Sequence, residues 1–126
     1  MARPEVLRHE EGVRLNAERL VALYAELGES GAERVIRDAM EELLARLTEL
    51  RRFADGRNTS AVIRSTRLIA AVADQIGLTT LGAVARDVLR TTEAGDWPGH
   101  AATLARLLRI AERSLCAVWD LHGMTV

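Results

Sequence analysis

Apolar residues recur along this chain at intervals of three and four, the spacing that places them on one face of an α-helix. Ala, Leu, Arg and Glu, which all favour helix, are abundant. No stretch alternates apolar and polar residues cleanly over the length of a β-strand. The pattern therefore predicts an all-α protein, with five helical segments separated by glycines and polar capping residues.

The first two segments are predicted at residues 16–27 and 30–54. Asn16 is the expected N-cap of the first segment, and Gly28 is its expected stop. Ser30 opens the second segment, which ends just before Gly56. The residues expected to face inward are Leu20, Leu23, Tyr24 and Leu27 in the first segment, and Ile36, Met40, Leu43, Leu47 and Leu50 in the second.

Three further segments follow, at residues 58–76, at 79–95 and at 96–123. Gly77 is the expected end of the third, Thr79 or Thr80 the expected cap of the fourth, and Asp96 the expected cap of the fifth. The inward stripes are Val62, Thr66, Ile69, Val72, Ala73 and Ile76; then Leu81, Val84, Ala85 and Val88; then Leu104, Leu107, Leu108, Ala111, Leu115, Val118 and Trp119.

Short connections between long amphipathic helices favour antiparallel neighbours. We therefore expect an antiparallel up-and-down four-helix bundle with a short N-terminal helix. The chain has 126 residues, which suits a single domain with one core, and residues 1–15 are expected to be flexible or irregular.

Composition and charge exclude several classes of function. The formal net charge is −1, so the chain has no basic excess for nucleic acid, and none of its 17 basic residues is Lys. No apolar run approaches the ~20 residues of a membrane span, and the first residues lack the apolar core of a signal peptide. We expect a cytoplasmic protein, and the Arg- and Ala-rich composition suits a bacterial source with a GC-rich genome.

No catalytic or metal-binding constellation is apparent in the sequence. The three histidines lack metal-ligand spacing, so we expect His9 in a solvated segment, His100 on the surface and His122 at a helix end. Cys116 lies among apolar residues and is expected to be a small buried hydrophobe. The sequence therefore predicts no metal, no cofactor and no enzymatic activity.

The segment from Arg67 to Gly77, RLIAAVADQIG, resembles the central motif of histidine-containing phosphotransfer (HPt) domains. Ile69, Ala73, Ile76 and Gly77 fit structural positions of that motif. The resemblance covers residues 16–119 in helix order, helix lengths and breaks, including the Gly95-Asp96 pair before the last helix. It implies a four-helix bundle that docks on the receiver domain of a response regulator in two-component signal transduction.

The motif departs from the family at the positions that carry phosphate chemistry. Arg67, Ala70 and Ala71 stand where the family has the phosphoacceptor His, a Lys and a Gly. A guanidinium has no free lone pair at physiological pH, so Arg67 cannot accept a phosphoryl group by the family mechanism. Ala71 is still small, so it need not block a partner. The resemblance therefore implies a pseudo-HPt protein, which binds a receiver or histidine kinase domain without carrying phosphate.

The predicted outer face of the third segment is the candidate partner-binding surface. The candidate partner-binding residues are Ile63, Arg64, Arg67, Ala70, Ala71, Asp74, Gln75 and Leu78. Helical spacing places all of them except Ala70 on the outward side of the helix, together with Ser60. Arg64 and Arg67 are one turn apart and would reach the carboxylate cup of a receiver. An ordinary solvated helix face is the simpler interpretation of the same residues.

Two alternatives stay open at this stage. Phosphotransfer through His100 or His122 would keep the family chemistry at another site. A helical interaction or dimerisation module, including a homodimer, would have no phosphorelay role and would present an apolar patch on another helix face.

Overall fold

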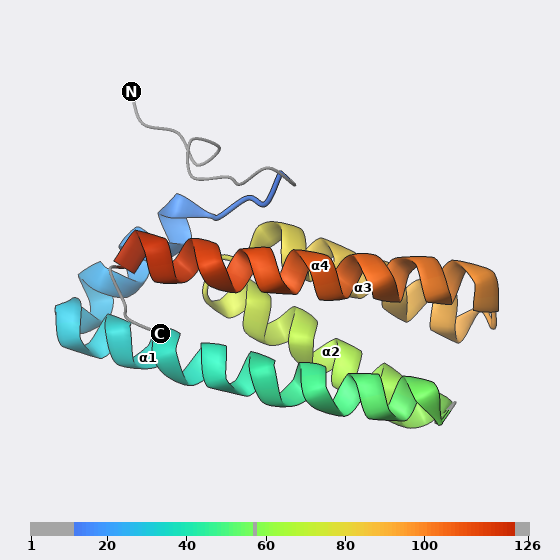
Figure 1. The fold of residues 1–126 in the computed structure, drawn as a ribbon. Helices are drawn as coiled ribbons and strands as arrows, with labels where there is room; N and C mark the ends of the chain where they lie inside the picture. Colours follow the sequence, from blue (N-terminus) through green and yellow to red (C-terminus); the bar gives the residue numbers. More distant parts are fainter. Residues whose placement is uncertain (1–11, 57, 123–126) are drawn as a thin grey trace.

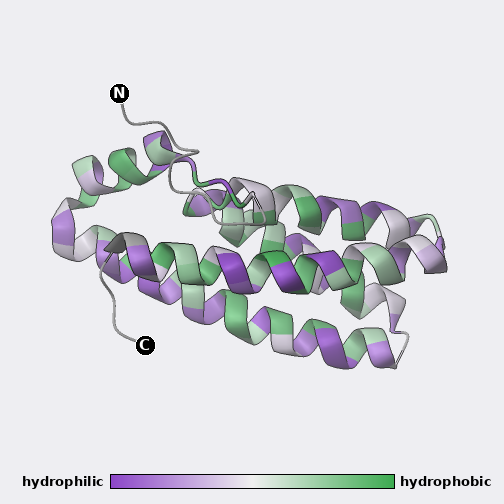
Figure 2. Ribbon diagram, turned by 45° about the horizontal axis from the view of Figure 1, so that its top comes forward, coloured by the Kyte–Doolittle hydropathy of each residue, from purple (hydrophilic) through white to green (hydrophobic). Residues whose placement is uncertain are grey.

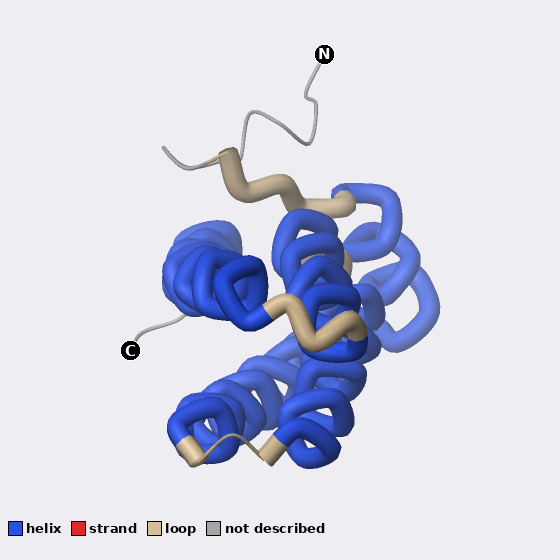
Figure 3. Tube along the Cα trace, turned by 90° about the vertical axis from the view of Figure 1, so that its right-hand side faces the viewer, coloured by secondary structure: helices blue, strands red, loops and turns tan. Residues whose placement is uncertain are grey.

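The computed structural model describes residues 12–56 and 58–122, which form four helices and no strand within these ranges. The helices are α1 (Ala17–Asp55), α2 (Thr59–Gln75), α3 (Thr79–Glu93) and α4 (Trp97–His122). Short loops join them (Figures 1 and 3). The prediction of an all-α protein is confirmed for this part of the chain. Within it, no helix is long and apolar enough to cross a membrane.

Helix α1 contains both of the first two predicted segments. Its backbone leaves the helical region at Gly28, where φ is 74° and ψ is 173°, and the helix axis changes direction there (Figure 1). The side chain of Asn16 caps the helix by accepting a hydrogen bond from the Arg19 amide at 3.1 Å. The predicted cap and the predicted break are therefore both confirmed, although the leading segment is continuous with the rest of α1.

Each helix packs mainly on its neighbours in the sequence. Helix α2 lies between α1 and α3, and α3 packs on α4 in turn, whereas α1 and α4 make few contacts with each other. Hydrophobic and hydrophilic positions alternate as bands along every helix (Figure 2). Burial of the hydrophobic bands supplies most of the driving force for packing amphipathic helices.

Most of the predicted inward residues are buried in a single core cluster, and the exceptions lie at its margins. Tyr24, Val72, Leu104, Leu108 and Trp119 are only partly buried against the core. The prediction that Leu27 faces inward is wrong, because its side chain is 46% exposed. Leu27 lies in the last turn before the break at Gly28, where the helical periodicity of this segment ends.

The segment before α1 is held against the turn between α2 and α3. Val13 and Leu15 are fully buried, and Leu15 forms an antiparallel bridge with Leu78. The Arg14 amide donates to Thr80 Oγ1 at 2.8 Å. Residues 12–15 are irregular, as expected, but they are packed against the turn and hydrogen-bonded to it, while residues 1–11 lie outside the described part of the chain.

The caps of the last two helices differ from each other. Asp96 caps α4 as predicted, because its Oδ1 accepts from the Gly99 amide at 3.0 Å. The predicted cap of α3 is wrong. The helix begins at Thr79, so Leu78 occupies the N-cap position, and its apolar side chain accepts no hydrogen bond. The Thr80 hydroxyl accepts from the Arg14 amide instead.

Candidate functional site

The outer face of α2 presents most of the predicted partner-binding residues. Arg64, Arg67, Ala71, Asp74 and Gln75 are exposed, as the helical spacing predicted. Ile63 and Ala70 are half-buried at the edges of this face, and Ala70 packs against the core. These seven residues are called the α2 face below.

Leu78 does not belong to the α2 face, and its predicted outward position is wrong. Its side chain is fully buried in the core. Helix α2 ends at Gln75, and Gly77 then turns the chain with φ of 79°. Helical spacing from Ala71 therefore no longer predicts where residue 78 points.

Arg67, at the position equivalent to the phosphoacceptor, forms an ion pair with α3. Its Nη2 donates to Glu93 Oε2 at 3.0 Å, and the two side chains are 62% and 43% exposed. Exposed pairs of this kind stabilise a fold by only about 0–1 kcal/mol, because water screens the charges. Arg67 can therefore exchange Glu93 for another carboxylate at small cost.

A second ion pair crosses from α2 to α3. Arg86 Nη1 lies 3.0 Å from Asp74 Oδ2, and both side chains are about half exposed. Gly82 makes this approach feasible, because a Cβ at that position would lie 2.5 Å from Asp74 Oδ1. Arg64 has no ion-pair partner among the described residues. The α2 face thus carries one cation without such a partner, one weakly held cation and one paired carboxylate.

His100 is buried rather than on the surface, which corrects the sequence-based expectation. It is 9% exposed, its Nδ1 lies 2.9 Å from Thr92 Oγ1, and the Trp97 ring meets it edge-on at 5.5 Å between centroids. Burial lowers the pKa of His100 below its ordinary value, because the charged imidazolium is poorly solvated there. His9 and the side chain of His122 lie outside the described part of the structure.

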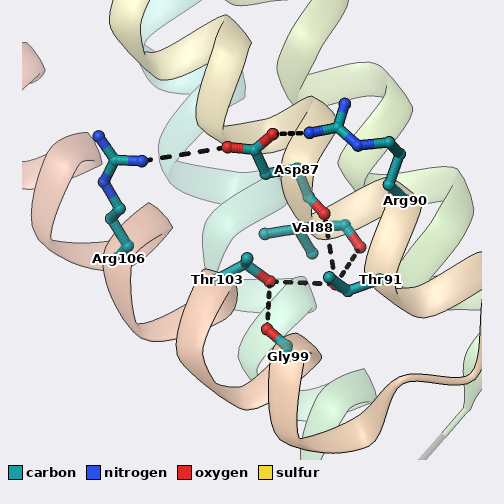
Figure 4. A network of polar contacts seen from close by, with 7 residues as sticks. All are labelled: Asp87, Val88, Arg90, Thr91, Gly99, Thr103 and Arg106. Carbon is teal, nitrogen blue, oxygen red and sulfur yellow. Dashed lines mark hydrogen bonds and ion pairs between the residues drawn. The ribbon is translucent and has the colours of Figure 1, made fainter.

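Polar contacts beside His100 fasten the start of α4 to α3 (Figure 4). The hydroxyls of Thr91 and Thr103 lie 3.1 Å apart across the two helices. Asp87 pairs with Arg90 on its own helix, and its other oxygen lies 4.0 Å from Arg106 Nη1 on α4. These contacts join α3 to α4 next to the Thr92–His100 pair in the sequence.

Cys116 is exposed, so the expectation of a buried thiol is wrong. It follows Leu107 by nine residues, which places it half a turn out of phase with the buried stripe. Cys116 lines a groove of about 300 Å³ between α1 and α4. The other lining residues are Leu44, Leu47, Thr48 and Arg51 on α1, and Leu108, Ala111, Glu112, Leu115 and Trp119 on α4.

The described residues contain no group of three or more His, Cys, Asp or Glu side chains that would hold a metal ion.

Sequence reasoning missed Glu93 and the Thr92–His100 pair. His100 had a usable signal, because it precedes Leu104 by four residues and so continues the inward stripe. Glu93 had none, because its meeting with Arg67 depends on how α2 and α3 are rotated about their axes.

Comparisons of the chain with protein-family models, with curated proteins and with solved structures found no match.

Proposed function

We propose that this chain is a pseudo-HPt phosphorelay protein, which binds the receiver domain of a response regulator or a histidine kinase through the α2 face without accepting phosphate. The observation that carries the proposal is the placement of Arg64 and Arg67 one turn apart on an exposed helix face, with the small Ala71 one turn further on. The two arginines provide positive charge for a carboxylate of the partner, and the small Ala71 side chain leaves room for the partner to approach the helix closely.

The proposal includes the bundle that the HPt resemblance implies, in up-and-down order with residues 17–27 as its short leading helix. The packing of each helix on its sequence neighbour supports this order. The short loops support it as well, because they favour antiparallel neighbours.

The proposed binding step is an exchange of carboxylates at Arg67. In the free protein Arg67 is paired with Glu93, and in the complex it would pair with an aspartate of the receiver. Arg64, which needs no such exchange, would supply long-range attraction toward the acidic cup. Transfer of the phosphoryl group stops at this point, because a guanidinium offers no lone pair to attack phosphorus.

His100 is a poor replacement for the missing acceptor. It is 9% exposed, whereas a receiver active site must contact the acceptor ring directly. His100 also lies at the junction of α3 and α4, where it contacts Thr92, and is not part of the outer face of α2. These two facts support binding without transfer over transfer at another histidine.

The test is a titration of isotope-labelled protein with receiver domains, with and without beryllofluoride as a phosphoryl mimic, followed by amide chemical shifts. Shifts centred on Arg64, Arg67, Ala71 and Gln75 are expected. Arg67→Glu should abolish binding while leaving the fold intact. Arg106→Glu makes the same charge change on α4, which packs mainly on α3, and should retain binding.

Glu93→Gln gives the sharper result, because it releases Arg67 without changing it. If carboxylate exchange limits binding, this variant should bind the receiver a fewfold more tightly than the wild type. Unchanged affinity in Arg67→Glu would refute docking through this face, whatever Glu93→Gln does.

A second candidate function is a helical dimerisation module, favoured by the groove between α1 and α4. The few contacts between these helices leave Leu44 46% exposed at this groove, and Arg51 and Glu112 give it side chains of opposite charge. A two-fold interface would pair each Arg51 with the partner's Glu112. Sedimentation of the wild type and of Leu44→Glu tests this function. The wild type should be a dimer and the variant a monomer, and a monomeric wild type would exclude the function.

A further inference from the structure

A second pocket lies where the end of α1 and the start of α2 meet the end of α3 and the start of α4. Its volume is about 230 Å³. Val62, Leu104 and Trp97 provide apolar walls, while Thr92 and His100 provide polar groups and Asp55 adds a carboxylate. A mostly apolar pocket with few convergent polar groups is the usual form of a small-molecule site.

The hydrogen bonds around Thr92 fix the tautomer of His100. The Thr92 hydroxyl donates its hydrogen to the carbonyl of Val88 at 2.7 Å. It has no second hydrogen, so its contact of 2.9 Å with His100 Nδ1 requires that Nδ1 donates. The neutral ring therefore carries its proton on Nδ1 and a free lone pair on Nε2.

The lone pair on Nε2 is available to a molecule in the pocket. Nε2 has no hydrogen-bond partner among the described residues. It is also absent from the set of described polar atoms that lack both a partner and access to solvent, so it is accessible. The ring itself is nine-tenths buried and lines the pocket. Because Nδ1 is turned onto Thr92, the opposite edge of the ring is the one left open.

We propose that this pocket binds a small, mostly apolar molecule that donates one hydrogen bond to His100 Nε2. A hydroxyl or amide N–H group satisfies this requirement, whereas an ether or a carbonyl has no hydrogen to give. The Val62, Leu104 and Trp97 side chains bury the apolar part, and Thr92 holds the imidazole in the accepting tautomer. The site is distinct from the α2 face and requires no phosphorelay partner.

The tautomer is tested directly by the ¹⁵N chemical shifts of the His100 ring near neutral pH. We expect a protonated Nδ1 and an unprotonated Nε2. A proton on Nε2 would overturn the proposal, because the ring would then offer a donor to the pocket. Thr92→Val removes the acceptor for Nδ1 and should allow both tautomers to appear.

Binding is tested with phenol and toluene, which have nearly the same shape but differ in the O–H donor. Phenol should bind about tenfold more tightly than toluene, although toluene is the more apolar molecule. Amide shifts should centre on Thr92, His100 and Leu104. Equal or weaker binding of phenol, or shifts that centre elsewhere, would overturn the proposal.

A matched pair of threonine variants links the preference to His100. Thr92→Val should reduce the phenol-over-toluene preference by releasing the tautomer. Thr48→Val removes a hydroxyl that likewise bonds a carbonyl four residues earlier, but it lies on α1 in the other groove and should leave the preference unchanged. Equal loss of preference in both variants would contradict the role assigned to Thr92.

Discussion

The backbone amide of Asn16 donates a hydrogen bond to the carbonyl of Gly77 at 2.7 Å, and this bond ties the start of α1 to the turn between α2 and α3. Arg19 reinforces the junction, because its Nε donates to the carbonyl of Gln75 at 2.8 Å. Gly77 has φ of 79°, and a Cβ there would lie 2.9 Å from the oxygen of Asn16. The junction therefore requires glycine for its backbone angle and for its lack of a side chain.

Gly77→Ala should lower the free energy of unfolding by about 2–4 kcal/mol, which combines the cost of left-handed backbone with the clash against Asn16. Gly95→Ala is the matched control, because Gly95 has φ of 68° but has open space where the new methyl group would lie. It should lose only about 1–2 kcal/mol. Urea unfolding followed by circular dichroism measures both, and equal losses would show that the contact with Asn16 costs nothing.

Leu78→Ala should cost about 2–5 kcal/mol, because its side chain is fully buried and the substitution leaves a cavity. Leu68→Ala is the control on α2, where the side chain is 40% exposed, and it should cost less than about 1 kcal/mol. The same urea experiment applies. A small loss for Leu78→Ala would mean that residue 78 lies on the surface, as helical spacing had suggested.

The helices and most of their buried stripes could be predicted because their causes are local. Asn16 and Asp96 cap helices through hydrogen bonds to amides three residues later, so the sequence contains both partners. Ile36, Leu43 and Leu50 recur every seven residues and are all fully buried. Local chemistry and helical periodicity are sufficient for such features.

Some of the errors occurred where a distant segment decides the outcome. Thr80 was a predicted cap of α3, but it lies inside the helix and its hydroxyl accepts from the amide of Arg14, which is 66 residues earlier. The burial of Val13 and Leu15 likewise depends on the turn at Gly77, which no pattern within residues 12–15 announces. Helical periodicity does not carry across a turn.

The candidate site was predicted in part. The periodicity of α2 correctly placed Arg64 and Arg67 outward, because their exposure depends on one helix alone. The pairing of Arg67 with Glu93 depends on the relative rotation of two helices and was not predictable. For Cys116, apolar neighbours in the sequence were misleading, since helix phase and not adjacency decides burial.

Cys116 should react with a thiol reagent such as DTNB in the native protein, because its side chain is exposed in the groove between α1 and α4. The labelling rate should be within about tenfold of the rate in denaturant, and Cys116→Ser should change stability by less than about 1 kcal/mol. Labelling that appears only after urea is added would show that the thiol is covered, for example by a second copy of the chain.

A double-mutant cycle with Arg67→Gln and Glu93→Gln should give a coupling energy of about 0.2–1 kcal/mol, because the pair is exposed to water. The coupling should shrink in ~1 M NaCl, where the screening length is only about 3 Å. Thermal or urea unfolding of the four proteins provides the energies. A coupling that salt leaves unchanged would indicate that the two residues interact by packing instead of charge.

The stability of the protein should fall as the pH is lowered through the titration of His100. Burial lowers the pKa of His100 in the folded state below the ordinary value of 6.5, so the unfolded chain binds its proton first. The stability that the neutral ring contributes is therefore fully present at a pH above the pKa of His100 in the unfolded chain. It decreases as the pH falls below that value, and it is lost below the pKa of His100 in the folded protein. Asp55 lines the same pocket, but burial alone accounts for the lowered pKa of His100.

Urea unfolding at about pH 7.5 and about pH 5 measures this effect when wild type and His100→Gln are compared. The two proteins differ only at residue 100, so the contributions of all other groups cancel in the comparison, and the wild type should lose more stability than the variant over this interval. The Hε1 resonance of His100 provides an independent readout, with a midpoint expected below 6.5. A midpoint at or above this value, together with equal losses in the two proteins, would mean that the ring is solvated.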